Sequence, residues 1–484
     1  MRNRYFFSIL VLLISMASTK SYAYDFEADG ICYNIISITD LTCEIAPRYS
    51  KSSNYTGDFN VPSEVQYNGK ILKVIQIGKY AFKESSVTSV TISSGITSID
   101  DYAFQDCKQM ENISIPNTVK SIGWTTFFGC RSITTLFLPN SVSEIKGQTF
   151  AYCTSLREIT IPDNIKIINK YTFRGCSSLN KVFLPNNLTI IGESAFEGCS
   201  SIEQIDIPKS IIEIGEAAFK ECSSLSSFTI PASCEIIKNY AFNGCELMSK
   251  VIIEDGDINE NPLSLGFSYI RNNNAKYYRD LFSEIPIDSL YLGKNVKRGK
   301  ELLPENGEGF RAQSNNGLFG RDLKSLTIGD MVTDDIYDGN VWEIFDTYPV
   351  GYYQEYRPIK HITFGKRITK IPLISHHDLD SVVVLNENPP IAEGFTNKTY
   401  IDCKLYVPNG CKTAYETAEV WKNFWNVFEL EQDINTLGVN MQDNYNQQKE
   451  VSRFTIDGIK LNNPHKGINI IKMNDGTVKK VMVK

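Results

Sequence analysis

Residues 156–178 read LREITIPDNIKIINKYTFRGCSS, and residues 179–201 read LNKVFLPNNLTIIGESAFEGCSS. The two stretches share one order of apolar, proline, phenylalanine and cysteine positions. Seven cysteines follow one another at intervals of 23 residues: Cys107, Cys130, Cys153, Cys176, Cys199, Cys222 and Cys245. A phenylalanine stands three residues before each cysteine: Phe104, Phe127, Phe150, Phe173, Phe196, Phe219 and Phe242. A fixed period in the twenties is typical of a solenoid, in which each repeat stacks on the next.

Each repeat, or rung, predicts the same sequence of short elements. Two apolar residues at alternate positions, such as Ile159 and Ile161, indicate a short strand with one buried face. A proline then ends the pairing, because it has no backbone N–H to donate. A second apolar pair, such as Ile165 and Ile168, begins another inward-facing piece. The phenylalanine and the cysteine fill the back of the rung, where a glycine such as Gly175 permits a tight turn.

The cysteine column has two interpretations, metal binding or disulfide cross-linking on the one hand and a ladder of buried thiols on the other. The sequence favours the ladder, because it contains no C-x-x-C motif and the cysteine repeats as a packing position. Cys234 occupies a position that is aliphatic in other rungs, so it should also point inward. Outside the ladder, Cys32 with Cys43 and Cys403 with Cys411 are two pairs that could form disulfides in an exported protein.

The rung resembles the BspA-type leucine-rich repeat of bacterial surface proteins. The family pattern L-x-x-I-x-I-P-x-x-V-x-x-I-G-x-x-A-F-x-G-C is met closely by residues 110–132 and 179–245. The entry segment 24–30 and residues 65–70 also resemble the start of such proteins. The resemblance implies a repeat solenoid: a right-handed array of 23-residue rungs, mostly β with short turns or helical pieces. The family contains adhesins that bind host extracellular proteins or other cells.

The chain divides into six predicted segments. Arg2 and Arg4, the apolar run 6–16 and the small residues near Ala23 resemble a signal peptide. The segments are a signal peptide (1–23), an N-terminal cap (24–74), regular repeats (75–253), degenerate repeats with a C-terminal cap (254–431), a polar linker (432–452) and a small C-terminal β module (453–484). The last segment also resembles the C-terminal sorting or surface-attachment tails of secreted bacterial proteins, and the alternative is a β module with no sorting role.

Strand-like pieces continue after the regular period ends. They are residues 290–292, 326–328, 362–364, 382–384 and 405–407. We interpret them as degenerate rungs separated by long insertions at 254–285, 294–322 and 330–358, which should project as loops. Residues 405–424 resemble a closing cap, which an array needs because its last rung would otherwise expose an apolar side.

The composition and the ionisable residues argue against several functions. The formal charge of −7 lacks the basic surplus that a nucleic-acid-binding protein needs. The adjacent His376 and His377 predict an exposed loop, since neighbours on a strand point to opposite faces. Two acidic clusters, Asp330 with Asp334, Asp335 and Asp338, and Glu254 with Asp255, Asp257 and Glu260, lack the spacing of a calcium loop. A serine nucleophile is not indicated, because no rung supplies a partner histidine. We expect no enzyme activity, no cofactor and no metal site.

The strand residues that point away from the core form the surface on which we expect a ligand to bind. In the column Thr91, Ser114, Phe137, Thr160, Phe183, Asp206, Thr229 and Ile252, two phenylalanines interrupt mostly polar residues. They lie two rungs apart, or about 10 Å, and exposed aromatic side chains often anchor partners. The alternative is that they pack against flanking side chains or an insertion. The predicted site consists of Phe137, Phe183, Thr160, Glu158, Lys181 and Asp206.

These observations predict an exported protein at the cell surface or outside the cell. We expect an adhesin-like protein that recognises a host extracellular-matrix protein, a glycan or a neighbouring cell through the strand face. The alternative is a non-catalytic scaffold in a surface complex of the same cell. Nucleic acid is not an expected partner, and no transmembrane span is expected after signal cleavage.

Overall fold

The computed structural model describes residues 23–257, 261–272, 275–282, 285–298, 323–333, 359–374, 377–430, 450–455, 460–461, 467–473 and 478–483. The chain divides into two compact units, Met1–Phe428 and Glu429–Lys484. Residues 1–22 of the predicted signal peptide, nearly all of the predicted linker and most of the insertions 294–322 and 330–358 lie outside the described residues.

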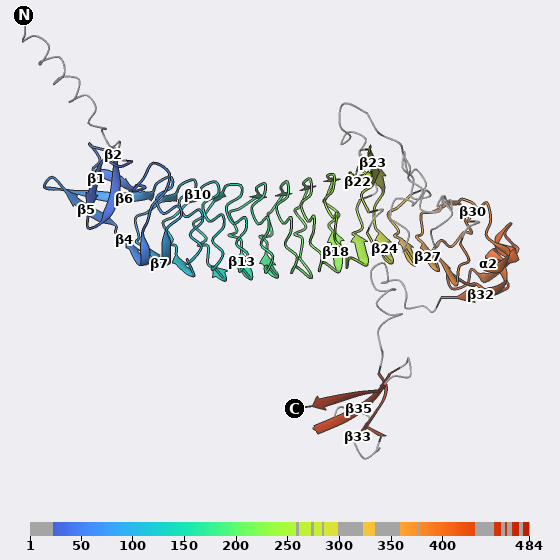
Figure 1. Cartoon of the computed structure of the whole chain (residues 1–484). Coiled ribbons are helices and arrows are strands. Elements are labelled where there is room, and N and C mark those ends of the chain that lie inside the picture. The colour runs from blue at the N-terminus through green and yellow to red at the C-terminus, as the bar shows by residue number, and fades with distance from the viewer. Residues whose placement is uncertain are drawn as a thin grey trace, which may run out of the picture. The chain divides into compact units, whose positions relative to one another are not determined.

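The first unit is a solenoid with two strand-lined sides, visible in Figure 1 with β13 on one side and β10 on the other. One side, which we call the first sheet, carries the strand that opens each rung and consists of three separately hydrogen-bonded groups of strands. Its strands are β4 (Thr56–Val61), β7 (Ser86–Ile92), β9 (Asn112–Ser114), β11 (Thr135–Leu136), β13 (Glu158–Thr160), β15 (Lys181–Phe183), β18 (Ser227–Ile230), β20 (Lys250–Ile253), β24 (Ser289–Leu292), β26 (Ser325–Ile328), β27 (His361–Phe364), β29 (Ser381–Val384), β31 (Lys404–Val407) and β32 (Asn426–Glu429). From β4 to β31, the pairings recorded between these neighbours are parallel.

The other side, which we call the second sheet, carries the second short strand of each rung and also consists of three hydrogen-bonded groups of strands. Its strands are β8 (Ser98–Ile99), β10 (Ser121–Ile122), β12 (Glu144–Ile145), β14 (Ile167–Ile168), β16 (Ile190–Ile191), β17 (Glu213–Ile214), β19 (Ile236–Ile237), β21 (Leu263–Leu265), β25 (Val296–Arg298), β28 (Lys370–Ile371) and β30 (Ile391–Ala392). At the N-terminal end this sheet begins with the strands of the predicted cap region: β1 (Phe26–Ala28), β2 (Ile31–Ser37), β3 (Thr42–Ile45), β5 (Glu64–Tyr67) and β6 (Lys70–Ile77). The pairs β1–β2, β2–β3 and β5–β6 are antiparallel, and β3 pairs with β6 in parallel. These elements agree with the predicted leucine-rich-repeat solenoid.

The phenylalanine column forms a stack of buried rings through the regular rungs. Phe173 lies between Phe150 and Phe196 with centroid distances of 5.4 and 5.3 Å, and the rings are within 11° of parallel. The spacing follows from the strand pairing, because parallel strands place equivalent residues about 5 Å apart. The same stacking runs from Phe82 to Phe242 and continues to Phe282.

The cysteine column is a ladder of buried free thiols that also forms hydrogen bonds. The Cys176 thiol donates to the carbonyl oxygen of Phe150 at 3.0 Å, and the Cys199 thiol donates to that of Phe173 at 3.1 Å. Each of the other five ladder thiols donates in the same way to the carbonyl oxygen of the phenylalanine in the rung before. Cys234 is also buried, as predicted. The thiol therefore gives a buried carbonyl oxygen a further donor, which alanine could not provide.

Each regular rung contains two left-handed backbone positions, two residues before and two residues after its phenylalanine. In the rung of Phe173 these are Tyr171 with φ 61° and Gly175 with φ 72°. The predicted glycine turn accounts for the second position in only four of the eight rungs, and no residue at the first position is glycine. Each non-glycine residue at these positions costs about 1–2 kcal/mol, offset by hydrogen bonds such as Tyr171 N–H to the Glu193 carbonyl at 2.8 Å.

The degenerate repeats keep the register of the first sheet. Lys250 pairs with Ser289, and the same line continues through Ser325 and His361 to Ser381. All five predicted strand pieces are strands of this sheet. The prediction of a plain loop at 254–285 is wrong in part, because β21 joins the second sheet and is followed by an antiparallel hairpin of β22 (Phe267–Asn272) and β23 (Ala275–Asp280).

The C-terminal end of the solenoid is covered by three short helices, α2 (Asn397–Asp402), α3 (Lys412–Thr417) and the 3-10 helix η3 (Trp421–Asn423). Trp421 is fully buried, and its indole N–H donates to the Pro390 carbonyl oxygen at 2.6 Å. The Tyr415 hydroxyl donates to the Asn386 carbonyl oxygen at 2.6 Å. Large aromatic side chains therefore close the apolar end of the last rungs, as the predicted cap requires.

The second unit contains one antiparallel sheet in the order β34–β33–β35–β36. Its strands are β33 (Glu450–Thr455), β34 (Lys460–Leu461), β35 (Gly467–Met473) and β36 (Val478–Val483). The connecting segments 456–459 and 474–477 lie outside the described residues. The sorting role of this unit stays a prediction.

Candidate recognition surface

The predicted ligand site lies on the outward side of the first sheet, which we call the strand face. Phe137 has 73% of its surface exposed and Phe183 has 52%. Thr160, exposed as well, pairs with Phe183 across the β13–β15 register, and Phe137 directly follows β11 on the other side of β13. The flanking side chains therefore leave both rings open to solvent on either side of a polar rung.

Charged side chains surround the two rings. Glu158 and Lys181 are cross-strand partners and both are exposed. Asp206 is exposed in the rung after Phe183. The strand face around the two phenylalanines thus combines apolar contact area with both signs of charge.

Three outward positions in the degenerate repeats are closed. Tyr291, Thr327 and Thr363 continue the outward column of Phe137 and Phe183, yet all three are buried. The Tyr291 hydroxyl donates to the Asp255 carboxylate at 2.7 Å. This column is therefore open in the regular repeats and closed at these three positions, whereas Val383 and Tyr406 beyond them are partly exposed. The sequence did not indicate the closed positions, because the outward column remains partly polar in both regions.

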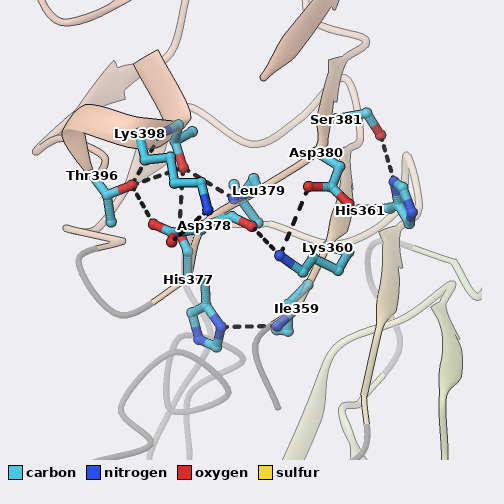
Figure 2. A network of polar contacts seen from close by, with 11 residues as sticks. Ile359, Lys360, His361, His377, Asp378, Leu379, Asp380, Ser381, Thr396 and Lys398 are labelled. Carbon is cyan, nitrogen blue, oxygen red and sulfur yellow. Dashed lines mark hydrogen bonds and ion pairs between the residues drawn. The ribbon is translucent and has the colours of Figure 1, made fainter. Parts of the chain in front are cut away.

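The prediction that His377 lies in an exposed loop is wrong. His377 is only 2% exposed, and its Nδ1 accepts a hydrogen bond of 3.0 Å from the backbone N–H of Ile359 (Figure 2). His376 lies outside the described residues. The imidazole is the hydrogen-bond acceptor for the Ile359 N–H, which precedes β27. A buried backbone N–H requires such an acceptor. Nothing in the sequence distinguishes this role from that of a surface histidine.

A polar network around Asp378 ties the last rungs to the cap (Figure 2). The Thr396 hydroxyl donates to the Asp378 carboxylate at 3.0 Å, and the Lys398 ammonium lies 3.5 Å from the same group. The Lys360 ammonium donates to the Asp378 carbonyl oxygen at 3.0 Å and lies 3.8 Å from the Asp380 carboxylate. These contacts join α2 to β27 and β29, so the network has a structural role.

The sequence did not indicate that a histidine and a serine would meet on the strand face. His361 Nδ1 lies 2.9 Å from the Ser381 hydroxyl oxygen, across paired strands (Figure 2). Burial lowers the pKa of His361, although the nearby Asp380 carboxylate opposes this shift. A catalytic triad places an acid on the second imidazole nitrogen, but the Asp380 carboxylate lies beside Lys360. The contact is therefore a cross-strand hydrogen bond.

The acidic clusters and the thiols provide little chemistry in the described part of the chain. Among those residues, no three His, Cys, Asp or Glu side chains are grouped to hold a metal ion. Asp330 forms an ion pair with Lys366 at 3.2 Å, while Asp334, Asp335, Asp338 and Glu260 lie outside the described residues. All twelve cysteines are free thiols, including both predicted candidate pairs. Burial raises the pKa of the Cys153 and Cys245 thiols to about 12, which disfavours the reactive thiolate.

The repeat region matches a known family. The profile of the "BspA type Leucine rich repeat region" matches residues 75–168 and 144–265, with six copies. Residues 75–265 are a BspA-type leucine-rich repeat region. The matched range begins in β6, near the predicted start of the regular repeats, and includes β21 beyond their predicted end. Phe137 and Phe183 therefore stand on BspA-type rungs.

Solved structures of bacterial leucine-rich repeat proteins are similar to the chain. A leucine-rich repeat protein from Bacteroides ovatus is 21% identical with a TM-score of 0.44, and the match covers 84% of this chain and 100% of that chain. The T. pallidum leucine-rich repeat protein is 24% identical with a TM-score of 0.35 over 42% of this chain and 90% of that one. A leucine-rich cell surface protein from Faecalibacterium prausnitzii is 18% identical with a TM-score of 0.37, over 84% and 95%.

Two further searches found nothing: one for similar curated proteins and one for membrane-spanning helices among the described residues. No curated protein is significantly similar in sequence to the chain. In the part of the chain that the structure describes, no helix combines the length and the hydrophobicity of a membrane span.

Proposed function

We propose that this BspA-type repeat protein is exported and acts as a non-catalytic recognition protein at the cell surface or outside the cell. Its partner is a host extracellular-matrix protein, a glycan or the surface of a neighbouring cell. The observation that supports this proposal is the exposure of Phe137 and Phe183 on a polar strand face. A solenoid presents such a face as a long, regular surface.

The geometry of the two rings suits an anchored contact. They lie two rungs apart, about 10 Å, and the buried ring and thiol ladders hold the rungs beneath them. Aromatic side chains contribute a large contact area at low conformational-entropy cost, and they are enriched among the residues that dominate binding energy. Glu158, Lys181 and Asp206 can then select partners by charge, which affects specificity and association rate more than affinity.

Burial of the ladder thiols is compatible with export. An oxidising environment favours disulfides, but oxidation requires an accessible thiolate. The ladder thiols are buried, and their pKa values are raised by burial. The predicted signal peptide at 1–23 supports the same location.

Binding to an array of matrix proteins, mucins and glycans tests the proposal directly. The chain without residues 1–23 would be compared with the Phe137→Ala/Phe183→Ala form, and Trp425→Ala would serve as the control. Trp425 is also 73% exposed, but it belongs to the cap. We expect a saturable signal that is lost in the double variant and kept in the control. A signal that all three forms share would contradict the assigned site. No signal from any folded form would instead favour a scaffold that binds a partner from its own cell.

A further inference from the structure

The second sheet carries an exposed apolar patch that the strand face does not explain. Ile167 pairs with Ile190, Ile190 pairs with Glu213, and Glu213 pairs with Ile236, so three isoleucines and one glutamate form one line across β14, β16, β17 and β19. Ile212 lies directly before β17. Ile167 is 42% exposed and Ile212 is 43% exposed, while Ile190 and Ile236 are partly exposed. We call these four isoleucines the isoleucine patch.

The isoleucines are not required by the repeat. The same outward position holds Ser98, Ser121 and Glu144 in the preceding rungs, and Ser264 and Lys297 in the rungs that follow. The inward neighbours, such as Ile168 and Ile191, already supply the core. Polar residues therefore satisfy the fold at this position, and a local group of exposed isoleucines indicates an interaction surface.

Charges of opposite sign lie at the two ends of the patch. Lys166 is exposed directly before Ile167, and Glu235 is exposed directly before Ile236, three rungs further on. Glu213, within the patch, forms an ion pair of 2.6 Å with Lys238. The line is therefore apolar except at Glu213, whose charge is paired with Lys238 of its own chain, and its two ends carry Lys166 and Glu235.

We propose that the isoleucine patch binds the same patch of a second copy of this chain. A two-fold axis that lies in the interface, parallel to the strands and between β16 and β17, places Ile167 against Ile236 and Lys166 against Glu235 of the other copy. Each contact then occurs twice, as in any isologous interface. The opposite charges at the two ends make the patch self-complementary in this arrangement.

The dimer is weak in solution. Four strands at about 4.8 Å span about 15 Å, and two residues along each strand span about 7 Å. The patch therefore covers on the order of 100 Å², well below the roughly 800 Å² per partner of a stable interface. On a cell surface, however, tethering raises the effective concentration. The patch and the strand face are on different sheets, and Figure 1 shows those sheets on different sides of the solenoid. Each dimer thus keeps both strand faces free.

Sedimentation of the chain without residues 1–23, over a wide concentration range, tests the proposal. We expect a reversible monomer–dimer equilibrium. Ile167→Ser/Ile236→Ser should raise its Kd about tenfold or more. Serine occupies this position in other rungs, so the double variant should fold, and an unchanged circular-dichroism spectrum would verify this. Leu247→Ser removes an exposed apolar side chain outside the patch and should leave the Kd unchanged.

Charge reversal tests the two-fold register. Lys166→Glu and Glu235→Lys should each weaken the dimer, because each places like charges opposite one another. The combination of both substitutions should restore the dimer, since the two charges exchange places across the axis. A chain that stays monomeric at every concentration would overturn the proposal, as would a dimer that the isoleucine substitutions do not affect. A dimer that the double charge reversal fails to restore would contradict the register.

Discussion

The phenylalanine stack makes a quantitative prediction for Phe173→Ala. Phe173 is fully buried, and its ring contacts Phe150 at 5.4 Å and Phe196 at 5.3 Å. Removing the ring eliminates both stacking contacts and leaves a cavity in a close-packed core. Substitutions of this kind cost about 3–5 kcal/mol. Phe183→Ala is the matched control, because its ring is half-exposed, and we expect it to change the stability by less than about 0.5 kcal/mol.

The assay must account for the repeat architecture. Rungs contact only their neighbours, so a central defect can separate the array into two parts that unfold independently. Urea unfolding followed by circular dichroism should show a lower midpoint or a divided transition for Phe173→Ala. Hydrogen exchange should locate the loss of protection in the rungs next to residue 173. If Phe173→Ala and Phe183→Ala had equal effects, or if the exchange changed only at the ends of the solenoid, the stacking argument would be refuted.

Three other predictions concern the thiols, one ion pair and the cap. The ladder thiols should not react with a thiol reagent in the folded state, whereas the less buried Cys411 should react first, as mass spectrometry of labelled protein would show. Lys220→Met should reduce stability by about 1.5 kcal/mol near neutral pH, because Lys220 donates to Glu197 at 2.9 Å. Burial raises the pKa of Glu197, but hydrogen bonds and nearby cations outweigh burial and hold that pKa below its usual value of 4.5. The ion pair therefore contributes fully to the free energy of unfolding above pH 4.5. This contribution is lost as the pH falls through the lowered pKa. Unfolding measured at neutral and acidic pH should therefore show a smaller effect of Lys220→Met in acid. Trp421→Ala should destabilise the last rungs by about 3–5 kcal/mol, and hydrogen exchange that stays unchanged around Pro390 would contradict this role.

Most of the fold could be predicted from the sequence, because each rung repeats the same local pattern. The alternation of Ile159 and Ile161 and the fixed place of Phe173 determine which side chains face inward, and parallel stacking then aligns them in columns. The five strand pieces after residue 253 were predicted on the same principle. The buried state of His377 could not be predicted, since it depends on Ile359, a residue that precedes a different strand.

The sequence by itself determined the repeat, the core columns and the two outward phenylalanines, because these depend on interactions between neighbouring rungs with one period. Only the tertiary structure decided which outward positions remain open. Tyr291 and Phe183 occupy the same column, yet one is buried and the other is exposed. The contact between His361 and Ser381 and the line of Ile167, Ile190 and Ile236 likewise arise from pairing across strands. Exposure and cross-strand contact depend on which residues lie beside a given residue in space. The local sequence pattern does not specify these neighbours.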